Sequence, residues 1–103
     1  MIVYEVNVFV QRAIETAYRH WLEHHVAEIL RLPGFIDAAI FEVIMPASDA
    51  DEFALCMHYR LDSELSLENY LRDHAPRLRA DGIARFGNNF RAERRVLREI
   101  PGY

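Results

Sequence analysis

The chain has 103 residues, of which 51% are hydrophobic and 27% are charged, and it contains only four glycines and four prolines. These proportions are typical of one globular domain, here residues 1–103, and they exclude a disordered tail, a collagen-like chain and a two-domain protein. All twelve basic residues are arginine, and sixteen acidic residues oppose them, so the formal net charge is −4.

The cysteine content and the N-terminal sequence indicate the cellular compartment in which the protein works. The single cysteine, Cys56, excludes an internal disulfide, a CxxC redox pair and a multi-cysteine zinc site. The N-terminal stretch has no basic segment, and Glu5 interrupts its apolar run, which does not fit a signal peptide. No apolar run approaches the roughly 20 residues of a membrane-spanning helix. We therefore expect a cytoplasmic protein that does not enter the membrane.

The charge is distributed unevenly along the chain. Residues 1–71 contain four arginines and twelve acidic residues, whereas residues 72–103 contain eight arginines and four acidic residues. This asymmetry indicates either a C-terminal third that attracts anions or acidic and basic surfaces that face each other across a dimer. We favour the second interpretation. Nucleic acid is not an expected partner, because the net charge is negative and the predicted strands lack the basic and aromatic pattern of RNA-binding sheets.

The first half of the chain predicts a strand followed by a helix. Residues 2–10 are dense in β-branched and aromatic residues and contain no glycine or proline, which predicts a strand. Over residues 13–32 apolar residues recur at steps of three and four, which predicts an amphipathic helix. Pro33 and Gly34 end this helix.

The second half predicts a hairpin, a helix and a last strand. Residues 35–45 and 53–61 are strand-like and are joined by a polar connection. Asp62 or Ser63 can cap a second helix, which we expect to kink or restart at Pro76. Residues 89–100 then form the fourth strand.

The element order is β-α-β-β-α-β, which predicts an α+β, ferredoxin-like fold. Right-handed crossovers give a four-stranded antiparallel sheet with two helices on one face. The predicted first strand is apolar on both faces, with Val6 and Val8 on one and Val3 and Phe9 on the other. A monomer of this kind would expose a large apolar sheet, which soluble proteins avoid. We therefore predict a homodimer that packs through its sheet faces.

Histidines are the first candidates for chemistry. His20 and His24 are one helical turn apart, but the HExxH pattern is missing, and we predict no metal site. His25 and His74 lie on the inward stripes of the two predicted helices. Each is either a buried structural histidine or part of a shared cavity between helices and sheet.

Polar residues on the predicted strands are the second group of candidates. Glu5 and Asn7 point to the same face of the first strand, where a dry and unpaired carboxylate would be costly. They are either paired structurally or line a wet pocket. Cys56, His58 and Arg60 share one face of the third strand, and sequence does not tell whether it is the face of Glu5. If Arg60 joins Glu5, a buried ion pair is the expected outcome, and Cys56 is expected to be a small buried hydrophobe.

Several segments together carry a resemblance to a known family. They are IVYEVNV at 2–8, Trp21-Leu22-x-x-His25, Pro33-Gly34-Phe35, Tyr70-Leu71-x-x-His74-Ala75-Pro76-x-Leu78-Arg79-x-x-Gly82-x-x-Arg85-Phe86-Gly87 and Arg94-Arg95-x-Leu97. In these segments, which extend over nearly the whole chain, the sequence resembles a bacterial family of unknown function numbered 4286. That family is grouped with the dimeric α+β barrels, which implies the same fold and the same dimer.

The resemblance implies no established activity. The wider superfamily includes cofactor-free antibiotic monooxygenases, haem-degrading oxygenases, lactone isomerases and sensor domains. Asn7 and Tyr70 correspond to an asparagine and an aromatic residue that line the pocket of the haem-degrading members. Ala80 stands where those members have a histidine, which argues against haem, and we predict no cofactor.

Two functional hypotheses follow. The first is a homodimer that binds a small hydrophobic or anionic ligand between helices and sheet. The second is a cofactor-independent monooxygenase or isomerase, in which Asn7 orients the substrate and His25 or His74 moves a proton. The candidate ligand-binding residues are Glu5, Asn7, His25, Tyr70, His74 and Arg85. Arg79 and Arg94, like Arg85, fall within the resembling motifs.

Overall fold

A computed structural model describes residues 1–103. Its elements in chain order are β1 (Ile2–Gln11), the 3-10 turn η1 (Arg12–Ile14), α1 (Glu15–Ile29), β2 (Phe35–Glu42), β3 (Glu52–Leu61), α2 (Glu64–Asp73), α3 (Ala75–Phe86), the 3-10 turn η2 (Gly87–Asn89) and β4 (Phe90–Arg98). The predicted four strands are confirmed, and β2 and β4 end earlier than predicted.

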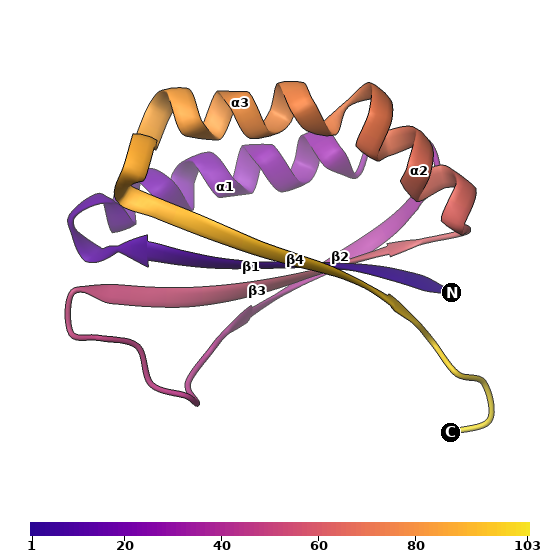
Figure 1. The fold of residues 1–103 in the computed structure, drawn as a ribbon, viewed down its shortest axis with the longest axis horizontal. Helices are drawn as coiled ribbons and strands as arrows, with labels where there is room; N and C mark the ends of the chain where they lie inside the picture. The colour runs from indigo at the N-terminus through magenta and orange to yellow at the C-terminus, as the bar shows by residue number, and fades with distance from the viewer.

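The strands form one antiparallel sheet in the order β2-β3-β1-β4. Strand β1 is therefore central, with His58 of β3 and Arg95 of β4 directly opposite Glu5 on its two sides. Figure 1 shows the three α-helices along one side of this sheet, with no helix on the other side. This is the predicted ferredoxin-like fold.

The predicted second helix is two helices. Ser63 caps α2, as predicted, by accepting a hydrogen bond from the backbone N–H of Ser66. His74 then leaves helical geometry, with φ −127° and ψ −38°, and Pro76 lies in the first turn of α3. A proline has no N–H to bond the carbonyl four residues earlier, here that of Arg72, and its ring clashes with that carbonyl. A continuous helix through Pro76 is therefore disfavoured, and a new helix starts here. The break also changes where His74 points relative to the apolar stripe.

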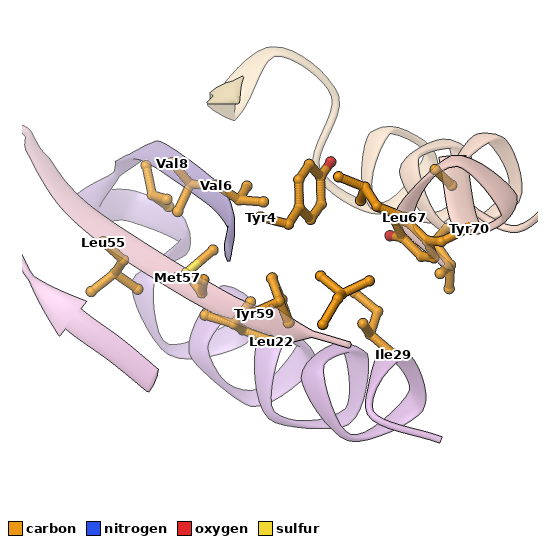
Figure 2. Close-up of a cluster of buried hydrophobic side chains, with 14 of the residues drawn as sticks. Tyr4, Val6, Val8, Leu22, Ile29, Leu55, Met57, Tyr59, Leu67 and Tyr70 are labelled. Carbon is orange, nitrogen blue, oxygen red and sulfur yellow. The ribbon is translucent and has the colours of Figure 1, made fainter. Parts of the chain in front are cut away.

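The core lies between the helices and the sheet. Alternate residues of β1 face the helices and are buried, namely Ile2, Tyr4, Val6, Val8 and Val10. Figure 2 shows Tyr4 and Tyr59 of the sheet beside Tyr70 of α2, among the aliphatic side chains of the helices, namely Leu22, Ile29 and Leu67. Burial of this apolar surface is the main force that fixes the helices on this face.

The opposite face of the sheet, which we call the open face, has no cover within the chain. Its central residues from β1 are Val3, Glu5, Asn7 and Phe9, the alternate set to those in the core. No helix of the protein has the length and apolar character that crossing a membrane requires.

Candidate functional site

A cavity of about 310 Å³ lies between the helix layer and the sheet. Helices α1 and α3 form one wall, and β1, β3 and β4 form the other. Its main lining residues are Tyr4, Val6, Val8, Tyr18, Trp21, Leu22, His25, Met57, Tyr59, Tyr70, Leu78, Arg79, Gly82, Phe90, Ala92 and Arg94. A mostly apolar cavity with a few convergent polar groups is the usual form of a small-molecule site.

Buried tyrosines bring hydroxyl groups to this cavity. Arg79 Nη2 donates a hydrogen bond of 2.9 Å to the hydroxyl oxygen of Tyr4. The hydroxyls of Tyr18, Tyr59 and Tyr70 take part in no side-chain hydrogen bond, although these residues are 1%, 1% and 5% exposed. Burial raises the pKa of all three, that of Tyr70 to about 12, so each hydroxyl keeps a proton that it can donate.

His25 contributes a neutral imidazole to the cavity. Its ring stacks on the indole of Trp21, with 4.4 Å between ring centroids and 20° between planes. Burial is the main cause that lowers the pKa of His25, so the imidazole is uncharged at neutral pH. Trp21 is itself held by a 2.9 Å hydrogen bond from its Nε1 to Asp81 of α3.

Gly82 lets α3 approach Trp21 closely. A Cβ atom at this position would come within 3.1 Å of Trp21 Cη2, which is tighter than ordinary van der Waals contact. The glycine of the resembling motif therefore has a physical role here, because it allows the indole to lie between α1 and α3.

Arg94 is the charged residue that affects the most groups of the cavity. Burial is the largest influence on the pKa values of Tyr18, His25, Tyr59 and Tyr70, and the charge of Arg94 also acts on all four. Arg94 comes from the edge strand β4 and faces the helices together with Ala92 and Phe90.

The structure brings together only part of the predicted site. His25 and Tyr70 both line the cavity. His74 instead borders a separate, polar depression of about 220 Å³ beside Pro33, because the break between α2 and α3 turns it away from the sheet. Arg85 Nε donates to the carboxylate of Asp81 at 3.2 Å, and Asp81 also accepts the hydrogen bond of Trp21 Nε1. Arg85 is therefore linked to the cavity only through Asp81 and does not line it.

Glu5 and Asn7 lie on the open face, not in the cavity. Glu5 is 4% exposed and accepts hydrogen bonds from Arg95 Nε at 2.5 Å and from Asn7 at 2.9 Å, with His58 Nε2 at 2.8 Å. The bond from Arg95 is the main reason why the pKa of Glu5 falls to about 2. Glu5, Asn7, His58 and Arg95 form what we call the open-face network.

The expected pair of Arg60 with Glu5 is wrong. Arg60 binds Asp37 of β2 through two hydrogen bonds of 2.6 Å. The strand register explains why Glu5 pairs with Arg95 and not with Arg60. Arg95 is directly opposite Glu5, whereas Arg60 is opposite Val3.

Glu5, Cys56 and His58 have ligand atoms within 4.8 Å of one another. The carboxylate is already engaged by Arg95, and burial, followed by the charge of Glu5, raises the pKa of the Cys56 thiol. A protonated thiol and a guanidinium beside the carboxylate both oppose a cation. The geometry fits a hydrogen-bonded network better than a metal site.

The site residues that sequence reasoning missed are mostly aromatic. Tyr18, Trp21 and Tyr59 were expected only as core or strand residues, because a residue that lines a cavity follows the same apolar pattern as a packed one. Arg79 and Arg94 could have been proposed as site residues from the sequence, since both fall within the resembling motifs and in the arginine-rich C-terminal third.

The sequence matches the family described as Domain of unknown function (DUF4286) over residues 1–100, so the chain belongs to that family. This confirms the resemblance seen in the sequence. No curated protein matches the chain.

Solved structures share the fold at low sequence identity. A candidate antibiotic biosynthesis monooxygenase from Deinococcus radiodurans has a TM-score of 0.76 at 10% identity, with 100% of this chain and 96% of that chain covered. SnoaB, a cofactor-independent oxygenase from Streptomyces nogalater, has a TM-score of 0.69 at 12% identity, with 98% and 95% covered. The de novo designed protein Foldit4 has a TM-score of 0.65 at 18% identity, with 96% and 98% covered. These similarities define the fold and not the activity.

Proposed function

We propose that the protein is a cytoplasmic homodimer in which each subunit binds a small hydrophobic ligand between its helices and its sheet. The observation that carries this proposal is the cavity of about 310 Å³, which has aromatic walls and tyrosine hydroxyls without side-chain partners. A cavity with mostly apolar walls and a few polar groups is the form that small-molecule sites usually take. The ligand site consists of His25 and Tyr70 from the predicted set, together with the aromatic residues of the cavity.

A cavity-filling variant tests ligand binding. Ala92 lines the cavity from β4, so Ala92→Phe places a ring in the space that the ligand needs. Ala84→Phe on the exposed side of α3 is the matched control, since Ala84 is exposed and does not line the cavity. A library of small aromatic compounds is screened by thermal shift on the wild type. We expect hits that Ala92→Phe loses and Ala84→Phe keeps, and equal loss in both variants would contradict the proposal.

The open face supports the homodimer. It carries an uncovered apolar rim in which Phe41 of β2 is 50% exposed, around the open-face network in the middle. A second copy that packs through its own open face would cover both the apolar rim and the open-face network. Light scattering should give a dimer for the wild type and for Leu65→Glu, which changes a similarly exposed residue of α2. Phe41→Glu should give a monomer, and a Phe41→Glu dimer would exclude this face.

A second candidate function is a cofactor-independent monooxygenase or isomerase. The neutral imidazole of His25 favours it, because such a group can take a proton from a bound substrate. Similarity to SnoaB is consistent with this chemistry but is a likeness of fold. Of the residues first considered, Asn7 and His74 lie outside the cavity, which leaves His25 as the candidate base.

Proton exchange tests this second function without requiring oxygen. An enolisable aromatic ketone is incubated with the protein in D₂O, and loss of its acidic C–H signal is followed by NMR. We expect exchange that His25→Gln slows at least tenfold and that His74→Gln leaves unchanged. Exchange that is no faster than in buffer, or that is equally slowed by both variants, would contradict the catalytic role of His25.

A further inference from the structure

The arginines of the chain differ sharply in whether they have a carboxylate partner. Nine of the twelve form ion pairs, with partners that come from helices and from the open face of the sheet. The three that have none are Arg31, Arg79 and Arg94. Two of these three, Arg79 and Arg94, line the cavity. The unpaired positive charge is therefore concentrated at the site of the proposed ligand.

The cavity lining contains no aspartate or glutamate, although the chain as a whole is acidic. Its third arginine, Arg91, is occupied elsewhere. The Arg91 guanidinium lies 3.8 Å from the ring centroid of Phe9 on the open face and pairs with Glu93. Arg79 and Arg94 thus give the cavity a positive charge that nothing within the chain neutralises.

The two arginines act on one region of the cavity. The hydroxyl of Tyr4 orients Arg79, which comes from α3. The ring of Tyr4 lies 5.9 Å from that of Tyr70. Arg94 is opposite Val6, two residues from Tyr4 on the same face of β1. The two arginines therefore line neighbouring parts of the cavity. Both residues are exposed, which places them at the mouth, whereas Tyr59 and Tyr70 lie within.

The polar groups of this region include two guanidinium groups and several tyrosine hydroxyls, all of which can donate hydrogen bonds. Guanidinium groups donate and cannot accept, and a protonated tyrosine hydroxyl can donate one bond. A carboxylate accepts several such bonds and gains from the charge of an arginine fork. The walls around it are the rings of Tyr18, Trp21 and Phe90, which suit a flat apolar body.

We propose that the ligand is an aromatic carboxylate, with its carboxylate held by Arg79 and Arg94 at the mouth and its ring system between the aromatic walls. This rests on the proposed function, because it requires that the cavity binds a ligand. It narrows the ligand from a hydrophobic molecule in general to an organic acid.

Three naphthalene derivatives that differ in one group test the charge preference. They are naphthalene-1-carboxylate, the neutral naphthalene-1-carboxamide and the cationic 1-naphthylmethylammonium, and binding is measured by titration calorimetry. We expect the carboxylate to bind at least tenfold more tightly than the amide and the cation to bind most weakly. Raising the salt concentration should weaken the carboxylate more than the amide, since salt screens exposed charges.

Binding measurements on arginine variants test whether the preference for the carboxylate arises at Arg79 and Arg94. Arg94→Gln and Arg79→Gln should each weaken carboxylate binding by about ten- to hundredfold, the range expected for hydrogen bonds to charged groups, and leave amide binding unchanged. Arg31→Gln is the matched control, because Arg31 also lacks an ion pair but lies outside the cavity. Its binding should equal that of the wild type.

The outcomes separate this inference from the proposed function. If the carboxylate and the amide bind equally, or if Arg31→Gln weakens the carboxylate as much as Arg94→Gln does, the anion subsite is wrong. Ligand binding in the cavity then still stands, provided that Ala92→Phe abolishes it. If none of the three compounds binds to the wild type, the inference fails together with the proposed function.

Discussion

The polar side chains on the two faces of the sheet differ in whether they have partners within the chain. On the open face, Glu5 is surrounded by Arg95, His58 and Asn7, and its carboxylate is satisfied within the chain. On the helix face, Arg94 has no carboxylate partner, and Tyr59 has no side-chain hydrogen bond.

A polar group that is already paired supports the fold, and one that is unpaired at a cavity is available to a ligand. The difference therefore assigns structure to the open face and recognition to the helix face. Substitutions at Glu5, Arg94 and Tyr59 test this division.

The largest effect should come from neutralising Glu5. Glu5→Gln removes the charge that three donors share, and we expect a loss of about 1–3 kcal/mol in the free energy of unfolding. For a domain of this size that corresponds to a fall in Tm of about 4–8 °C per kcal/mol. Thermal unfolding at one fixed protein concentration measures it, because dimerisation makes Tm depend on concentration.

Glu28→Gln on α1 is the matched control for Glu5→Gln, since Glu28 is exposed in the helix layer, away from the open face, and pairs with the exposed Arg77. We expect a change of less than about 0.5 kcal/mol there. Equal effects of the two substitutions would contradict a structural role for the open-face network.

Acid should remove the contribution of Glu5. The pKa of Glu5 is lowered from 4.5 to about 2 in the folded protein, chiefly by the hydrogen bond from Arg95. Its stabilising effect is complete above the unfolded-state value of 4.5 and is lost as the pH falls from about 4.5 to about 2. Unfolding measured across this range should show a steeper loss for the wild type than for Glu5→Gln, and parallel curves would contradict this account.

The titration of His25 gives a smaller, site-specific effect. Burial lowers the pKa of His25, and Arg94 lowers it further, whereas Glu28 and Asp81 raise it. Arg94→Gln should therefore raise the pKa of His25, as followed from its ring C–H signals in an NMR titration. Arg31→Gln should not change it, and a His25 pKa that is equal in both variants would place Arg94 away from the cavity.

The smallest effect should come from a tyrosine hydroxyl of the helix face. Tyr59→Phe removes a hydroxyl without a side-chain partner, so we expect a change within about 0.5 kcal/mol in the free energy of unfolding. Tyr4→Phe removes the acceptor of the Arg79 hydrogen bond and should cost about 0.5–1.5 kcal/mol. A Tyr59→Phe cost as large as that of Tyr4→Phe would show that its hydroxyl is bonded in the fold.

The fold could be predicted from the sequence because it depends on periodicity and on turn residues. The alternation of apolar residues in β1 and their helical spacing in α1 follow directly from burial on one face. Ser63 and Pro76 mark the starts of helices for local reasons, hydrogen bonding for the serine and sterics for the proline. The break at His74 was predicted as a kink or a restart, and the structure shows a restart.

The site was harder to predict from the sequence than the fold, because it depends on which strands become neighbours. Glu5 and Asn7 were correctly placed on one face, but the sequence pattern did not show that this face is the open one. The pairing of Arg95 with Glu5 follows from the β1–β4 register, which the residue order alone does not define. A cavity is a gap between packed residues, and hydrophobic periodicity does not distinguish Tyr18 at its wall from a residue without a gap beside it.

Methyl-resolved NMR during titration with naphthalene-1-carboxylate tests the division between the two faces most directly. Val6, Val8 and Ile83 line the cavity, whereas Val3 lies on the other side of β1 with Leu97 of β4 opposite it. We predict that the signals of Val6, Val8 and Ile83 shift in a saturable manner and that those of Val3 and Leu97 stay in place. Shifts that are largest at Val3 and Leu97 would assign recognition to the open face and contradict the account.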